Sequence, residues 1–334
     1  MRSTVSTTFR RLTGVLAGLT LIAGVTACGG ADADDDSTGL TPVTVGFPWN
    51  GGAGSTPRDT GPFGYAESLG LAEPILEKHG FEFERYVGFN NGPPVVQALQ
   101  SGDVTVGSIG DVPAVQARGN GQTISPVLVK KPASGIWFLT NDPALDSIDK
   151  LKGKKVGLQF GSNFDRYGRA ALDRHGALDE NNLVNLLFAD ALPALQKGSI
   201  SAVAVPANVA AVWLENNDFT VASKAEVDDP DLLSTNVAVT TDDFRRNHPE
   251  ITEAYWEVEK AGIAEIRKDL DKYVAWAADA QKVSVESVRV SSTWQYSDER
   301  IDPDGVRTLE SSLAFLLDQG IVKNGFDVNE WVNS

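Results

Sequence analysis

Two stretches of the chain, about a hundred residues apart, follow the same pattern of helix end, buried strand, loop and new helix. They span residues 98–113 and 194–212. In the first stretch, Gly102 suits the left-handed position just past a helix, and Pro113 suits the first turn of the next helix. The repeat predicts two α/β halves of similar architecture. The plainer interpretation, that any α/β chain repeats such units, explains the fold class equally well.

The loops that follow the predicted strands are candidate binding sites. In open α/β sheets, ligands bind beyond the carboxyl ends of the strands. Gly92, Gly110 and the pair Gly161-Ser162 each precede a predicted helix. A helix N-terminus offers unpaired N–H groups and a partial positive charge, so it can bind an oxyanion. Each loop alone is better explained by ordinary helix capping, but three of them together favour a site.

Several side chains near these loops have two interpretations. The Gly/Pro-rich loop 48–62 is long enough to suggest a function, and its Trp49 could cover a ligand or pack in the core. Arg58 and Arg166 could neutralise an anion or lie solvated on the surface. Asp111 could receive a donor or cap a helix. The complete set of candidate ligand-binding residues is Trp49, Asn91, Gly92, Gly110, Asp111, Gly161, Ser162, Asn163, Arg166, Pro206 and Asn208.

The N-terminus is predicted to be an export signal. Residues 1–27 contain three arginines followed by an apolar core too short to span a bilayer. The segment ends at Cys28, the only cysteine of the chain, in a pattern that resembles a bacterial lipobox. We therefore expect a lipid on Cys28, a flexible charged tether over 28–40, and attachment to the outer face of the cell membrane.

Composition excludes several classes of function. The formal charge is −16, and it becomes −19 without the three arginines of residues 1–27, which contain no acidic residue. This charge disfavours nucleic acid and anionic lipid as partners. One cysteine leaves no disulfide, no cysteine-based zinc site and no thiol catalysis. We expect no metal and no cofactor.

Catalysis has little support in the sequence. The three histidines, His79, His175 and His248, precede a glycine or a proline and are typical of helix ends. The sequence contains no nucleophile elbow, no His-Glu-x-x-His and no phosphate-binding loop. We predict a protein that is not an enzyme.

Two groups of motifs resemble the aliphatic sulfonate, nitrate and taurine binding proteins of ABC importers. The first covers residues 92–94, 98–102 and 107–113, and the second covers 149–156 with Gly161-Ser162. The resemblance implies an α/β, two-lobed clamp of the type II periplasmic-binding-protein kind with two hinge strands. It also implies a monomer that captures a small-molecule ligand and delivers it to the permease and ATPase subunits of an importer.

The expected lobes follow from where the pattern breaks. Lobe 1 is predicted over 41–133 and 241–334, and lobe 2 over 134–240, with hinges near Lys131–Gly135 and Asn236–Thr241. A chain that leaves one domain and returns has the covalent layout of a closing cleft.

The ligand predicted from this resemblance is a small organic oxyanion, most simply a sulfonate. The chain departs from the family pattern at Thr105, Ser201, Ala204-Val205 and 163–166, all of which we place at ligand loops. The ligand therefore need not be an ordinary alkanesulfonate. The alternatives are a binder of a thiamine precursor or another heterocycle, and an exported enzyme on the same fold.

Overall fold

The structure is a computed structural model that describes residues 39–49 and 56–333. The described residues do not include the predicted signal segment or residues 28–38 of the predicted tether, which begin with Cys28. Within the described ranges, no helix is both long and apolar enough to cross a membrane.

The first sheet has five strands in the order β2-β1-β3-β10-β4. β1 is parallel to β2 and β3, whereas β10 is antiparallel to β3 and β4. Helices cover both faces of such a sheet, so its strands are apolar along most of their length. The strand bounds are β1 (Thr41–Pro48), β2 (Phe81–Phe89), β3 (Val106–Gly110), β4 (Ile124–Val129) and β10 (Asn236–Thr241).

The second sheet repeats this arrangement in the order β7-β6-β8-β5-β9. Its fourth strand, β5, is antiparallel to both neighbours, as β10 is in the first sheet. The two repeated stretches of the sequence contain β3 and β8, which are the third strands of their sheets. The predicted two-lobed α/β architecture is thus confirmed. The bounds are β5 (Ile136–Thr140), β6 (Val156–Leu158), β7 (Leu183–Asn185), β8 (Ala202–Pro206) and β9 (Thr220–Lys224).

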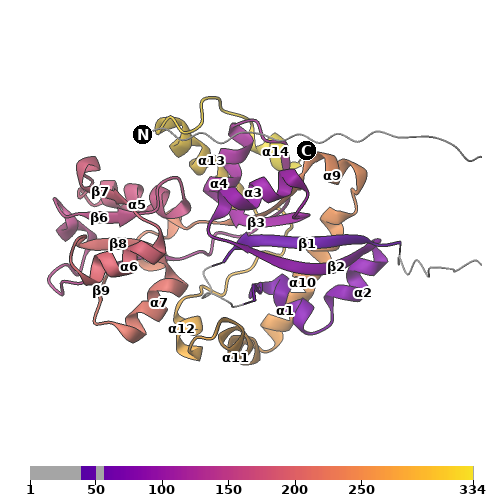
Figure 1. Cartoon of the computed structure of the whole chain (residues 1–334), viewed down its shortest axis with the longest axis horizontal. Helices are drawn as coiled ribbons and strands as arrows, with labels where there is room; N and C mark the ends of the chain where they lie inside the picture. Colours follow the sequence, from indigo (N-terminus) through magenta and orange to yellow (C-terminus); the bar gives the residue numbers. More distant parts are fainter. Residues whose placement is uncertain (1–38, 50–55, 334) are drawn as a thin grey trace, which may run out of the picture. The chain divides into compact units, whose positions relative to one another are not determined.

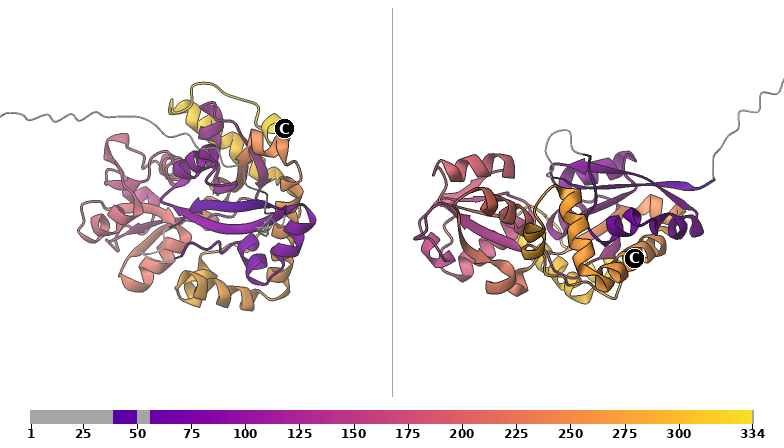
Figure 2. Two further views of the ribbon diagram at one scale, coloured as in Figure 1. Left: turned by 45° about the vertical axis from the view of Figure 1, so that its right-hand side comes forward. Right: turned by 90° about the horizontal axis from the view of Figure 1, so that it is seen from below.

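Helices pack around each sheet, and we call a sheet with its helices a lobe (Figure 1). The elements of lobe 2 form a group separate from those of lobe 1 when seen from below (Figure 2). Lobe 2 contains α5 (Asn163–Arg174), α6 (Phe188–Gln196), α7 (Ala207–Asn216), α8 (Ala225–Asp228), η1 (Ile148–Leu151), η2 (Glu180–Asn182) and η3 (Pro230–Leu232). Lobe 1 contains α1 (Pro62–Ser68), α2 (Ala72–Lys78), α3 (Gly92–Ser101), α4 (Asp111–Gly119), α9 (Asp242–Asn247), α10 (Ile251–Lys268), α11 (Leu270–Gln281), α12 (Val285–Val290), α13 (Pro303–Asp318) and α14 (Val328–Asn333).

Two local predictions about helix ends are confirmed. Gly102 ends α3 with a φ of 82°, in the left-handed region that glycine enters without steric cost. Pro113 lies in the first turn of α4, where its missing N–H has no intrahelical partner to lose. The repeated pattern therefore reflects real helix ends rather than chance composition.

The chain crosses between the lobes twice, over 130–135 and 233–235. The two crossings touch, because the N–H of Ser134 donates to the carbonyl of Ser234 at 3.1 Å. The sequence placed residues up to 240 in lobe 2, but β10 belongs to the sheet of lobe 1 from Asn236 onward. The reason is burial: Val237 and Val239 are fully buried between strands β3 and β4.

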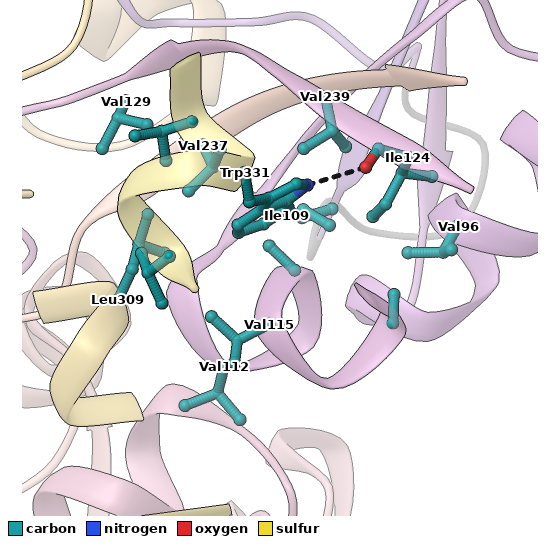
Figure 3. Close-up of a cluster of buried hydrophobic side chains, with 14 of the residues drawn as sticks. Val96, Ile109, Val112, Val115, Ile124, Val129, Val237, Val239, Leu309 and Trp331 are labelled. Carbon is teal, nitrogen blue, oxygen red and sulfur yellow. Dashed lines mark hydrogen bonds between the residues drawn. The ribbon is translucent and has the colours of Figure 1, made fainter. Parts of the chain in front are cut away.

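The C-terminal helix α14 closes one face of the lobe 1 core. Trp331 is 2 % exposed and packs among valines and leucines of β4, β10 and α13 (Figure 3). Its indole Nε1 donates to the carbonyl of Ile124 at 2.8 Å, as the dashed line in Figure 3 marks. The last helix thus contributes both apolar area and a buried hydrogen bond to the sheet.

We predict that Trp331→Ala lowers the free energy of unfolding by about 3–5 kcal/mol, because it removes a large buried ring and leaves a cavity. Urea denaturation followed by circular dichroism measures the loss. Trp331→Phe keeps most of the packing and should cost clearly less. Equal stability of the alanine variant and the wild type would contradict the packing role of α14.

Candidate functional site

A cleft of about 1010 Å³ lies between the two lobes. Its walls are built from the loops after β1, β2, β3, β6 and β8, all at the carboxyl ends of parallel strands. This is the edge at which open α/β sheets bind ligands, because helix N-termini gather there. The repeated supersecondary unit therefore brings loops from both halves of the chain to one place.

Most of the candidate residues line this cleft. They are Trp49, Asn91, Gly92, Gly110, Gly161, Ser162, Asn163, Pro206 and Asn208, and Arg58 lies there too. Their contact with a ligand stays a prediction. Asp111 and Arg166 are not among the lining residues, and both are almost fully buried, at 0 % and 3 % exposed.

Asp111 and Arg166 form an ion pair between the lobes. Arg166 Nε of α5 lies 3.2 Å from Asp111 Oδ2 of α4. Asp111 also accepts a hydrogen bond from Ser312 Oγ at 2.5 Å and from the N–H of Thr235 at 3.2 Å. Burial raises the pKa of Asp111, and the guanidinium of Arg166 works against that rise. We therefore assign this pair to the junction of the lobes, in place of the predicted ligand contact.

The N-terminus of α4 is occupied by protein contacts. The N–H of Asp111 donates to the carbonyl of Thr235 at 3.1 Å, and the N–H of Val112 donates to Asn163 Oδ1 at 3.2 Å. A Cβ on Gly110 would lie 2.3 Å from Asn163 Nδ2, so only glycine allows this approach. The amides predicted near Gly110 as anion donors instead join the lobes at the base of the cleft.

Ser162 acts as the N-cap of α5. Its hydroxyl accepts from the N–H of Phe164 at 3.2 Å and donates to the carbonyl of Gln159 at 2.5 Å. This is ordinary helix capping, the plainer of the two predicted interpretations. At α3, Pro93 and Pro94 occupy the first turn and have no N–H to offer.

Helix α7 has the helix end best suited to an anion. Its N-cap is Pro206, it has no side-chain cap, and its first turn holds no acidic residue. The N–H of Ala207 donates to the carbonyl of Gly135 at 3.0 Å. The next two residues, Asn208 and Val209, line the cleft, so the N-terminus of α7 lies beside the space open to a ligand.

Formal charge in the cleft is nearly balanced. The charged lining residues are Arg58, Asp59 and Lys130. Lys130 Nζ lies 2.6 Å from Glu259 Oε1, a buried carboxylate behind the wall. Burial works to lower the pKa of Lys130, but the carboxylates of Glu259 and Asp59 together outweigh it and hold the pKa above its usual value. The cleft is thus close to neutral in a chain of net charge −16.

Three departures from the family pattern are not among the residues that line the cleft. Thr105 precedes β3, and its hydroxyl accepts from the N–H of Thr44 at 3.2 Å. Ser201 precedes β8, and its N–H donates to the carbonyl of Lys155 at 2.8 Å. Residues before a parallel strand lie at the amino edge of the sheet, opposite the ligand loops. Their placement at ligand loops was therefore wrong, and so was that of the buried pair Ala204-Val205 within β8.

The histidines lie outside the cleft lining. His79 Nε2 contacts Glu257 at 3.2 Å, His175 Nε2 contacts Asp229 at 3.4 Å, and His248 packs against Phe244. Among residues 39–49 and 56–333, no group of three His, Cys, Asp or Glu side chains is arranged to hold a metal ion.

Sequence reasoning missed Lys130 and most of the aromatic residues of the cleft. Phe160, Phe188, Trp213 and Trp294 line it, yet they come from widely separated parts of the chain. No local motif marks them, since an isolated aromatic residue is more often part of the core.

Comparisons with known proteins agree with this architecture. A family model described as "NMT1/THI5 like" matches residues 76–272. An aliphatic sulfonates-binding protein of Escherichia coli (strain K12) is 30% identical over 141 residues, which are 41% of this chain and 44% of that protein. A taurine-binding periplasmic protein of the same organism is 27% identical over 169 residues, 50% of this chain and 52% of that protein. The chain spans about half the length of the curated relatives it matches.

Solved structures share the fold. The periplasmic aliphatic sulphonate binding protein from Escherichia coli superimposes with a TM-score of 0.68 at 18% identity, over 88% of this chain and 98% of that one. A desulfurization enzyme superimposes with a TM-score of 0.64 at 14% identity, over 87% and 96% of the two chains. The curated relatives above are named as binding proteins, whereas this neighbour is an enzyme.

We predict that Arg166→Met lowers the free energy of unfolding by about 3–5 kcal/mol near pH 7, because Asp111 is left buried and uncompensated. The pKa of Asp111 is raised in the folded state, so the protonated carboxyl favours folding. This stabilisation is fully present at pH values below the pKa of the unfolded chain, and it is lost as the pH rises through the pKa of the folded state. The deficit of the variant should therefore shrink toward about pH 4.5. Urea denaturation at the two pH values measures it.

The double variant Asp111→Asn/Arg166→Met is the control. Asparagine keeps the shape of the aspartate and carries no charge, so it should restore most of the lost stability at neutral pH. A deficit in Arg166→Met that does not change with pH would contradict the assignment of the loss to Asp111.

Proposed function

The chain belongs to the NMT1/THI5-like family, and from this premise we propose that it is an extracytoplasmic solute-binding protein of an ABC importer. It captures a small organic oxyanion and delivers it to a permease. The observation that carries the proposal is the nearly neutral cleft at the carboxyl edges of two sheets, in a chain of net charge −16. The names of the relatives make a sulfonate the first candidate.

Neutral donors suit such a ligand. An unpaired arginine buried at the site would cost on the order of several kcal/mol of desolvation in the empty state. The uncapped N-terminus of α7 supplies amides and a partial positive charge without that cost. It faces the cleft through Asn208 and Val209.

Ligand capture is proposed to draw the lobes together about the two crossings. The lobes already touch on both sides of the cleft. On one side α4 meets α5 through the pair of Asp111 and Arg166. On the other side α7 meets α12, where Ser287 Oγ donates to Glu215 at 2.7 Å (Figure 1). All covalent connections between the lobes run through these two crossings, and such a layout allows a hinge motion.

An exported enzyme is the alternative class, since a desulfurization enzyme has the same fold. An activated nucleophile needs a base within hydrogen-bond reach. The described residues that line the cleft include neither histidine nor cysteine. The cleft composition therefore favours binding over catalysis.

The test of the anion is the variant Asn208→Asp. It places a negative charge at the N-terminus of α7, where an acidic residue stabilises the helix, so folding should not suffer. We expect sulfonate affinity to fall by about tenfold or more, because two like charges a few ångströms apart repel. Calorimetric titration with ethanesulfonate, nitrate, and neutral and cationic heterocycles measures it.

Asn216→Asp is the matched control, with the same charge change at the other end of the same helix. It should leave the affinity nearly unchanged. Binding confined to a neutral or cationic heterocycle, or tightened by Asn208→Asp, would refute the oxyanion proposal and support the thiamine-precursor type of ligand.

Membrane attachment through a lipid on Cys28 is proposed from the sequence alone. Cys28→Ser removes the only thiol of the chain, so the variant should lose the lipid and leave the membrane fraction. Metabolic labelling with a radioactive fatty acid, followed by membrane fractionation, measures both effects. Label retained on the serine variant would refute the anchor.

A further inference from the structure

We propose that the ligand is an aromatic oxyanion, a planar ring system that carries one sulfonate-type group. The inference rests on the proposed function and names the class of ligand more closely. Nine of the 47 residues that line the cleft are aromatic, whereas aromatic residues make up 8% of the chain. The aromatic share of the cleft is thus about twice that of the whole sequence.

Trp49 forms part of the lobe 1 wall and is held in place by its surroundings. Its ring meets that of Phe47 edge to face, with centroids 6.2 Å apart. Its backbone N–H donates to the carbonyl of Phe89 at 2.7 Å. A Cβ on Gly88 would lie 2.8 Å from Trp49 Cβ, so glycine there makes room for the indole. The half-buried ring therefore has a defined position at the cleft.

Trp294 forms another part of the same wall, with an unusual backbone. Its φ is 56°, a left-handed conformation that bulky side chains rarely adopt. Its ring meets Tyr273 at 6.0 Å and an interplanar angle of 89°. Glycine or asparagine would adopt this backbone at lower cost, so the indole occupies this cleft position at a steric cost.

The lobe 2 wall of the cleft also offers rings. Phe164 in the first turn of α5 and Phe188 at the start of α6 meet edge to face at 5.0 Å, and both are half-buried. Phe160 is 40 % exposed, with Arg169 stacked on its ring at 4.9 Å. Both lobes thus present aromatic surface to the same space.

Aromatic walls on both sides favour a flat ring between them. Rings prefer offset or edge-to-face contact with other rings, and closure would bury both walls against such a ligand. A taurine-sized ligand would leave most of this surface wet in a cleft of about 1010 Å³. The amides of α7 receive the anionic group, and the rings receive the body of the ligand.

Calorimetric titration of the full chain with naphthalene-2-sulfonate, ethanesulfonate, taurine, 2-naphthoate and neutral naphthalene-2-sulfonamide tests the proposal. We expect one site that binds the naphthalenesulfonate at least about tenfold more tightly than ethanesulfonate and taurine. 2-Naphthoate distinguishes a general oxyanion from a sulfonate, and its binding above the alkyl compounds also supports the aromatic class.

Phe188→Leu keeps an apolar side chain of similar size and removes one ring of the wall. It should weaken naphthalenesulfonate binding by about threefold to tenfold and leave ethanesulfonate unchanged. Phe326→Leu is the matched control, because Phe326 is also half-buried and edge to face with a partner, Trp331 at 5.4 Å, away from the cleft lining. It should change neither affinity.

The outcomes separate the inference from the proposed function. Ethanesulfonate or taurine binding as tightly as the naphthalenesulfonate would overturn the aromatic class and leave the oxyanion proposal standing. The neutral sulfonamide binding as tightly as the sulfonate would overturn the oxyanion proposal and with it the inference. Equal losses from Phe188→Leu for the aryl and alkyl sulfonates would also overturn the inference.

Discussion

The buried ion pair between Asp111 and Arg166 is the interaction on which the junction of the two lobes depends. A charge removed from water is costly unless it is paired and hydrogen-bonded. Arg166 meets this demand with Asp111 and with the carbonyls of Leu232 and Leu233, and Asp111 meets it with Ser312 and Thr235. The pair therefore ties together α4, α5, α13 and the return crossing, and it is satisfied only when all of them are in place.

This use of charge also explains the character of the cleft. Arg166 forms an ion pair with Asp111, and Lys130 forms one with Glu259 at 2.6 Å. These two cations are thus compensated by the protein itself, and the lining carries little net charge. In the proposed function, helix ends and ring faces recognise the ligand, and the cleft distinguishes ligands by shape and by the position of a single anionic group rather than by total charge.

Glycine has a related role where the lobes meet. Asn163 of lobe 2 approaches Gly110 of lobe 1 so closely that a single added carbon would collide with its amide. The same amide oxygen accepts the N–H of Val112. A helix end that could have bound an anion is thereby used as a docking point between lobes. We therefore propose the binding role for α7, whose N-terminus has no side-chain cap.

The sequence by itself determined the local features and the repeated unit. Residue preferences that act within a few positions account for Gly102 at a left-handed helix end, for Pro113 in a first turn, and for the short buried strands β3 and β8. Only the tertiary structure decided what Arg166 does, that β10 belongs to lobe 1, and that distant rings line one cleft. The physical reason is that a charged or aromatic side chain takes its role from the groups it meets. Such groups lie far away in the sequence, as Asp111 does from Arg166, and they are brought close only by the packing of the sheets and their helices.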